Sequence, residues 1–231
     1  MNESIKMLVE LGYDKKYAEE IVNYYPINTL TDMTLKNNIK RNYKFLLNLG
    51  YTKEEIIKMT KSLPSLYGLS EENITNKINF LIKQGYSKEE VIKITKTLPA
   101  LYSYSEETIT NKINFLIKQG YSKEEVIKMI KTLPALYGIS EENIEEKIEY
   151  YKEKGLEFII TEDTKQLMQS MKKTKARYNY LTEVMLMDID ESNYRRLFYD
   201  EKKFQKTYGV STDSLIKTYG LEPNVSKLIN E

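Results

Sequence analysis

The chain has 231 residues, with 35 Lys and Arg against 34 Asp and Glu, and it contains no His, Cys or Trp. A disulfide needs two Cys and a structural zinc site needs Cys or His ligands, so both are excluded. Catalysis by a His base or a Cys nucleophile is excluded as well. The formal net charge of +1 excludes a uniformly basic nucleic-acid binder but allows local basic patches.

The N-terminal residues MNESIKMLVELGY carry no targeting signal that we can identify. They lack an apolar signal core, and Glu3 and Glu10 are unusual for an organelle transit peptide. Elsewhere no apolar run approaches the roughly 18 residues that a membrane helix needs. We therefore expect a soluble, cytoplasmic protein with no membrane association.

A repeat of 35 residues dominates the sequence. Residues 78–112 and 113–147 are identical at 28 of 35 positions. A Gly-Tyr pair and a Pro recur with the same period, once in each unit. A more divergent unit with Gly12-Tyr13 and Pro26 precedes them. The repeated positions are Gly50-Tyr51, Gly85-Tyr86 and Gly120-Tyr121, and Pro64, Pro99 and Pro134. Internal repeats of this length are typical of solenoids.

The first half of each unit predicts an amphipathic helix. Ser70 is a good N-cap, and its equivalents are Ser105 and Ser140. Ile74, Ile78 and Leu81 lie at i, i+4 and i+7, which places them on one face of a helix. Gly85 stands where a left-handed residue would end that helix.

The second half of each unit predicts a shorter helix and a tight turn. Ser87 and Glu90 form a capping box, which recurs as Thr52 to Glu55 and as Ser122 to Glu125. Pro99 ends the helix, because a Pro inside it would lose a hydrogen bond and clash with the preceding turn. The following residues 100–102 suggest a single 3₁₀ turn with Leu101 pointing inward.

One such unit cannot bury its apolar faces alone, so the sequence predicts an all-α, right-stacked helical-repeat solenoid with a helical C-terminal cap. We expect helical repeats over 1–160 and the cap, with a basic segment, over 161–231. The repeat units would lie near residues 5–42, 43–77, 78–112 and 113–147, with a partial fifth from 148.

The repeated pattern resembles the mitochondrial transcription termination factor (mTERF) repeat. The similar segments are S-E-E-N-I-x-x-K-I-x-F-L, G-Y-S-K-E-E-V-I-K and L-P-A-L-Y in the units, Q-S-M-K-K-T-K-A-R-Y-N-Y-L at 169–181, and the ending at 197–219. The resemblance implies units of two α-helices and a short 3₁₀ helix, and it implies binding of DNA or RNA along a basic groove in transcription or translation. Arg is absent from residues 43–147, which argues against sequence-specific base reading there.

Recurring Lys residues near the ends of the second helices are the first candidate contacts for nucleic acid. Stacked units would align them into two parallel rows that could follow phosphates. The alternative is structural, because Lys in a final turn complements the helix dipole and could pair with the Glu residues that open the next helix. The rows are Lys58, Lys93 and Lys128, and Lys61, Lys96 and Lys131.

A basic cluster near residue 175 is the second candidate, followed by Tyr178 and Tyr180, which could stack on bases or pack. A mixed basic and aromatic helix can equally be an ordinary amphipathic surface. A second basic stretch follows further on. The candidate residues here are Lys172, Lys173, Lys175, Arg177, Arg195 and Arg196.

The repeated tyrosines could serve as platforms for single-stranded bases. Their fixed place in the repeat is better explained by packing between units with the hydroxyl at the surface. They are Tyr51, Tyr86 and Tyr121, and Tyr67, Tyr102 and Tyr137.

The sequence shows no carboxylate constellation or metal-binding loop, and no phosphate-binding or dinucleotide motif, so we expect neither an enzyme nor a cofactor. Two functions remain. The first is a non-catalytic solenoid that binds DNA or RNA mainly through phosphates. The second is a scaffold or inhibitor that docks on a larger protein or ribonucleoprotein, which the near-neutral, Arg-poor repeats favour.

Overall fold

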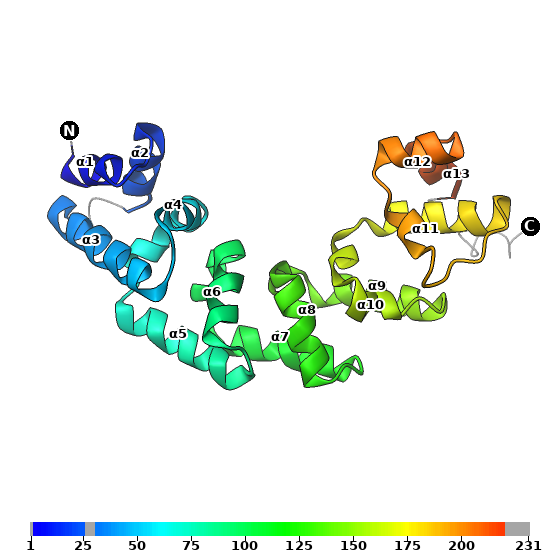
Figure 1. Ribbon diagram of the computed structural model, residues 1–231, viewed down its shortest axis with the longest axis horizontal. Helices are drawn as coiled ribbons and strands as arrows, with labels where there is room; N and C mark the ends of the chain where they lie inside the picture. The colour runs from blue at the N-terminus through cyan, green and yellow to red at the C-terminus, as the bar shows by residue number, and fades with distance from the viewer. Residues whose placement is uncertain (1, 26–30, 220–231) are drawn as a thin grey trace, which may run out of the picture. The chain divides into compact units, whose positions relative to one another are not determined.

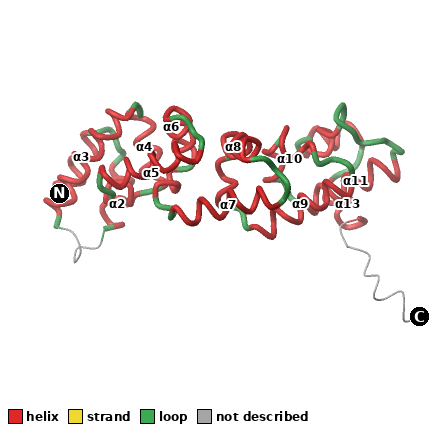
Figure 2. Tube along the Cα trace, turned by 90° about the horizontal axis from the view of Figure 1, so that it is seen from below, coloured by secondary structure: helices red, strands yellow, loops and turns green. Residues whose placement is uncertain are grey.

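A computed structural model describes residues 2–25 and 31–219. Within them every regular element is a helix, and Figure 2 shows only helices joined by loops. The chain forms two compact units, Met1–Tyr137 and Gly138–Glu231, which are described separately below. The predicted turn at Pro26 lies outside the described residues. The predicted boundary at residue 160 concerns a different division, between repeats and cap, and stays a prediction.

The first compact unit consists of helix pairs, most of them followed by a 3₁₀ helix (Figure 1). Its elements are α1 (Glu3–Glu10), α2 (Lys15–Tyr24), α3 (Asp32–Leu49), α4 (Lys53–Ser62), η1 (Pro64–Gly68), α5 (Glu71–Gln84), α6 (Lys88–Thr97), η2 (Pro99–Tyr102), α7 (Glu106–Lys118), α8 (Lys123–Thr132) and η3 (Pro134–Gly138).

The predicted helix ends are confirmed. The hydroxyl of Ser70 accepts the backbone N–H of Asn73 at 3.0 Å, and the capping boxes of α4, α6 and α8 are complete. Gly85 has a φ of +115°, in the left-handed region that strains a residue with a side chain. An added Cβ there would meet only ordinary contacts, so Gly is required by the backbone and not by space.

Pro64, Pro99 and Pro134 each begin a 3₁₀ helix, and the turn predicted after Pro99 is confirmed. The residue before each Pro, such as Leu98 with φ −130° and ψ 74°, leaves the helical region because a following Pro disfavours it. The Leu two residues after each Pro is fully buried, as Leu66, Leu101 and Leu136 show. The Leu side chain of each turn therefore packs into the core between neighbouring helix pairs.

Neighbouring repeats pack through equivalent helices. α1 contacts α3, and α2, α4 and α6 contact one another in succession. In Figure 1, α3 and α5 lie on one side of this unit, and α4 and α6 lie on the other. The second helices are buried on two sides, since Ile92 and Ile94 lie on nearly opposite faces of α6 and are only 9 % and 3 % exposed.

The repeated tyrosines join neighbouring repeats through buried hydroxyls, which corrects the prediction that those hydroxyls lie at the surface. The hydroxyl of Tyr51 lies 2.6 Å from that of Tyr102 and 2.5 Å from that of Thr95, both in the next repeat. Tyr13 contacts Tyr67 and Thr60 in the same way, one repeat earlier. These rings cannot stack on bases, because they are at most 5 % exposed.

We call each set of two Tyr hydroxyls and one Thr hydroxyl a relay. The relay is incomplete one repeat later. The hydroxyl of Tyr86 lies 3.1 Å from that of Tyr137, but Ile130 replaces the Thr between them. Tyr121, the last of the series, is half-buried.

The second compact unit continues the helical pattern in less regular form. Its elements are α9 (Glu141–Glu153), α10 (Phe158–Glu162), η4 (Thr164–Met168), α11 (Met171–Asn179), the π-helical turn η5 (Tyr180–Val184), η6 (Tyr194–Phe198), α12 (Glu201–Tyr208) and α13 (Thr212–Tyr219). The basic segment at 169–181 becomes α11, which packs against α13.

Candidate nucleic-acid interface

One of the two predicted Lys rows is neutralised by the neighbouring repeat. The amine of Lys96 lies 2.9 Å from the carboxylate of Glu55, and that of Lys131 lies 2.8 Å from Glu90. Lys61 lies 3.5 Å from Asp14 in the same arrangement. The row of Lys61, Lys96 and Lys131 therefore links successive second helices.

The carboxylates in these pairs belong to the caps of the preceding repeat. Glu55 and Glu90 are the capping-box residues, and they accept both a backbone N–H and a Lys amine. The predicted partner was a Glu opening the next helix, and that expectation was wrong. The hydrogen bond from Lys131 and that from the backbone of Ser87 lower the pKa of Glu90, so this carboxylate is ionised at neutral pH.

The other row remains open to solvent. Lys58, Lys93 and Lys128 are exposed, and no carboxylate of residues 2–25 or 31–219 lies within 4.0 Å of their amines. Each lies one turn after the capping Glu of its own helix, as Lys93 does after Glu90. These amines are available to an anionic ligand, and stacking repeats them at equivalent places in three successive units.

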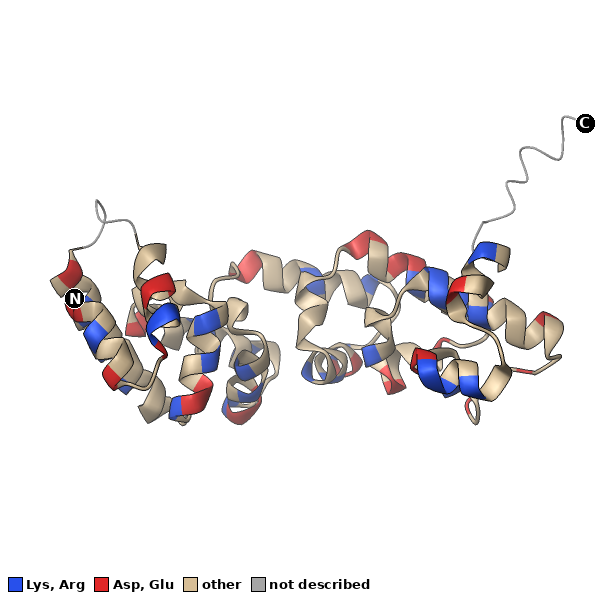
Figure 3. Cartoon of the chain, turned by 90° about the horizontal axis from the view of Figure 1, so that it is seen from above, with Lys and Arg blue, Asp and Glu red and all other residues tan. Residues whose placement is uncertain are grey.

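Charge of both signs occurs on the helices of each compact unit, as the colours in Figure 3 show. Within this mixed charge, one Lys of each of α4, α6 and α8 is paired with a carboxylate and another is exposed.

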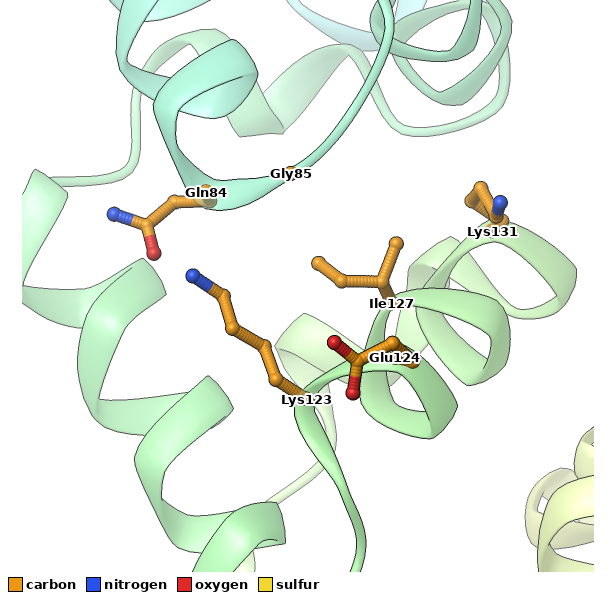
Figure 4. A pocket seen from close by; sticks show the side chains of 6 residues that line it. All are labelled: Gln84, Gly85, Lys123, Glu124, Ile127 and Lys131. Carbon is orange, nitrogen blue, oxygen red and sulfur yellow. The ribbon is translucent and has the colours of Figure 1, made fainter.

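A surface groove between two repeats of the first compact unit also contains Lys residues (Figure 4). It encloses about 410 Å³ and is lined by Gln84, Gly85, Lys123, Glu124, Ile127 and Lys131. Lys131 is engaged by Glu90, and Glu124 opposes the charge of Lys123. The lining has mixed charge and no pair of groups suited to acid–base chemistry.

The predicted basic cluster on α11 divides into exposed and engaged residues. Lys172 and Lys173 are exposed, whereas Lys175 lies 3.0 Å from the carboxylate of Glu146 on α9. Tyr178, one of the aromatic residues that follow, packs edge-on against the ring of Tyr150. Lys172 and Lys173 therefore remain the candidates on this helix.

The structure contradicts a ligand-binding role for Arg177, which is only 4 % exposed. Its guanidinium donates to the hydroxyl of Thr212, to the carboxylate of Glu201 and to the backbone carbonyls of Leu197 and Tyr199. These bonds use all five of its N–H groups. Burial lowers the pKa of this guanidinium, and the charge of Glu201 opposes that change. Arg177 holds α11 to the C-terminal helices.

Arg177 is one case of a position that recurs through the chain and that sequence reasoning missed. At this position a first helix donates to carbonyl groups at or just after the following 3₁₀ helix. Asn42 donates to Leu66, Tyr67 and Leu69, Lys77 donates to Tyr104, and Lys147 donates to Leu167. The last carbonyls of a helix lack a following helical N–H and carry the negative end of the helix dipole, so a cation suits them. The carbonyl of Leu66 also accepts the N–H of Leu69 at 3.4 Å.

The signal for this position was present in the sequence. Lys77 follows Ile74 by three residues and precedes Ile78, so it lies beside the apolar stripe and not on the opposite face. Lys112 and Lys147 occupy the same place and are 7 % and 5 % exposed. Burial lowers the pKa of Lys147, a change opposed by the nearby Glu146.

The two remaining predicted residues lie within η6. Arg195 is exposed, and its guanidinium lies 3.9 Å from the carboxylate of Asp163, so the pair is loose. Arg196 is half-buried and donates to the hydroxyl of Tyr208. Arg195 therefore presents an accessible cation, whereas Arg196 is engaged within the fold.

The repeated helix–helix–3₁₀ architecture, with its left-handed Gly and its Pro-initiated turns, defines an all-α helical-repeat protein. The chain belongs to the mTERF family, which it matches over residues 1–205. This confirms the resemblance inferred from the repeat, in a family whose members are in general non-catalytic. No curated protein shows a significant sequence match to the chain. None of the helices in the described ranges is long and apolar enough to cross a membrane.

Proposed function

We propose that this chain binds nucleic acid without catalysis, through phosphate contacts made by Lys58, Lys93 and Lys128. The observation that carries the proposal is the difference between the two Lys rows. One row is engaged by carboxylates, whereas the other is exposed and recurs on three successive second helices. Membership of the mTERF family supports the same function.

The residue type in the row favours phosphates over bases. A Lys amine is a compact point charge, whereas bidentate contact with a base edge is typical of Arg. Because the repeats over 43–147 contain no Arg, the row suits the backbone of DNA or RNA. This binding would serve transcription or translation.

The second compact unit has exposed basic residues of its own. Lys172 and Lys173 on α11 and Arg195 within η6 are exposed. We include these three residues in the proposed contacts and omit Arg177, because its guanidinium is fully engaged inside the fold.

The test is a titration of duplex DNA, single-stranded RNA and structured RNA at several salt concentrations. Each phosphate contact releases condensed counterions, so the logarithm of the affinity falls with the logarithm of salt concentration by about 0.9 per contact for duplex DNA. Changing Lys58, Lys93 and Lys128 together to Gln should reduce that slope by about 2 to 3.

A matched control changes Lys61, Lys96 and Lys131 to Gln. This variant has the same composition and net charge as the first, and the three changes lie on the same helices. We expect its salt slope to stay at the value of the unmodified chain, because those amines bind carboxylates of the fold. Equal slopes for the two variants would contradict the assignment of the row, and no saturable binding to any nucleic acid at low salt would contradict the function.

A further inference from the structure

An exposed apolar tip lies at the end of the π-helical turn η5 in the second compact unit. Val184 and Met185 are 50 % and 44 % exposed, and Leu186 is 84 % exposed. Among the large hydrophobic side chains of the described residues, Leu186 is the most exposed. Single exposed apolar residues are common on protein surfaces, but three in succession at a turn are not explained by packing.

The backbone at Leu186 gives no reason for a Leu either. Its φ is +48°, and every other described residue with positive φ is a Gly. A left-handed residue at the end of a helix favours Gly, because a side chain strains that conformation. The backbone N–H of Met187 donates to the carbonyl of Leu181 at 2.9 Å, a bond that a Gly at 186 would allow equally. Leu186 therefore strains the backbone and contributes little buried surface to the fold.

The tip is held in place by local hydrogen bonds. The N–H of Met185 donates to the carbonyl of Tyr180, and the side-chain amide of Asn193 donates to the carbonyl of Asp188 at 2.8 Å. An apolar group that is already fixed in position loses little conformational entropy when it binds.

The surroundings of the tip are acidic. Glu183, Asp188, Asp190 and Glu191 are exposed, and residues 178–194 contain no Lys or Arg. The charge of Lys154 interacts with that of Glu183, so the acidic groups at 188, 190 and 191 carry the excess charge. Nucleic acid and anionic membranes would be repelled by this charge, so neither fits the tip. An apolar pocket bordered by basic side chains would complement both the tip and its acidic rim.

We propose that Val184, Met185 and Leu186 form a docking knob that inserts into an apolar pocket, bordered by Lys or Arg, on a different protein. The small size of the knob suits a weak or transient complex. The proposal does not rest on nucleic-acid binding, since its residues are separate from the exposed Lys row.

Site-specific photocross-linking tests the knob in the full chain. The change Met185→p-benzoylphenylalanine places the probe beside Leu186 and leaves Leu186 itself in place. In the cell of origin, after nuclease treatment, we expect one discrete adduct with another protein. The same probe at Met168, an apolar residue of this compact unit that is 54 % exposed, should not give that adduct. No adduct, or the same adducts from both positions, would overturn the proposal.

Other occupants give different results. With the purified chain alone, a cross-linked dimer would mean that a second copy covers the knob. An internal cross-link to residues 220–231 would mean that the chain covers its own tip. Binding to vesicles of phosphatidylcholine and phosphatidylglycerol that is lost in Leu186→Gly would assign the tip to a membrane. Each of these three results overturns the proposal.

Affinity measurements with the purified cross-linked protein complete the test. We expect Leu186→Gly to weaken its binding at least tenfold without lowering the melting temperature, because Gly relieves the left-handed strain. Asp188→Lys should also weaken it, because that change reverses one charge of the acidic rim. Unchanged affinity in both variants would show that the adduct arose from proximity alone.

Discussion

The same residue type performs two tasks in these repeats, and burial distinguishes them. Lys147 lies within the fold and donates to the carbonyl of Leu167, whereas Lys58 reaches solvent. A buried cation is tolerated where it meets carbonyl groups that have no helical partner. Arg177 makes more of these contacts than the Lys residues do, because its planar guanidinium donates to four different residues.

We predict that Lys147→Met lowers the free energy of unfolding by about 1–3 kcal/mol, because the carbonyl of Leu167 is left buried without a donor. Lys173→Met, an exposed change on α11, should stay within about 0.5 kcal/mol. Urea denaturation of both variants measures the difference. Equal stability of the two would mean that the buried bond contributes nothing.

Successive repeats are joined by polar contacts as well as by apolar packing. In the relay of Tyr51, Thr95 and Tyr102, each hydroxyl is buried and partnered by another hydroxyl. Such contacts specify which surfaces of neighbouring units meet, because a shifted unit would leave buried hydroxyls without partners. The relay stays neutral, since burial raises the pKa of Tyr51 and of Tyr102.

The relay predicts instability in alkali. In the unfolded chain tyrosines ionise near pH 10, whereas burial raises the pKa of Tyr137 to about 12 and that of Tyr51 further. The folded state therefore binds more protons above pH 10, and its stability is complete below that pH and falls as pH rises through the folded-state values. Urea denaturation from pH 8 to pH 11 should show the decline.

A variant that removes one complete relay is the comparison. Tyr51→Phe, Thr95→Val and Tyr102→Phe together replace all three hydroxyls with apolar groups of similar shape, so stability at pH 8 should change little. Above pH 10 its stability should fall less steeply than that of the unmodified chain. A parallel decline in both proteins would assign the alkaline effect to other tyrosines.

At the scale of the whole molecule, the near-neutral charge and the exposed Lys row determine how strongly and how specifically the chain could bind nucleic acid. With a net charge of +1, long-range attraction to nucleic acid is weak, so the proposed short-range contacts, including those of Lys58, Lys93 and Lys128, would have to supply most of the affinity. Contacts to phosphates position a protein on nucleic acid but carry no sequence information directly.

We therefore predict little discrimination between sequences. Two duplexes of equal length and base composition but different order should bind within about tenfold of each other, since one good bidentate base contact is worth about 1–3 kcal/mol. Competition titrations at a fixed salt concentration measure the ratio. A preference of a hundredfold or more would show that base edges are read, and it would point away from the Lys row as the main contact.

Periodicity and local chemistry are enough to predict the elements of the repeats. The N-caps at Ser70, Ser105 and Ser140, the capping boxes, the left-handed Gly85 and the turn at Pro99 are all decided within a few residues, and the structure has each of them. The family follows from the same repeat.

Only the tertiary structure decided which polar groups are available to a ligand. Lys93 and Lys96 are three residues apart on one helix, yet one is exposed and the other binds Glu55 of the preceding repeat. Similarly, Arg177 and Lys172 belong to one basic segment, and only packing against the C-terminal helices buries Arg177. The physical reason is that these partners lie some 20 to 45 residues away along the chain, so their positions depend on how helices stack and not on local propensity.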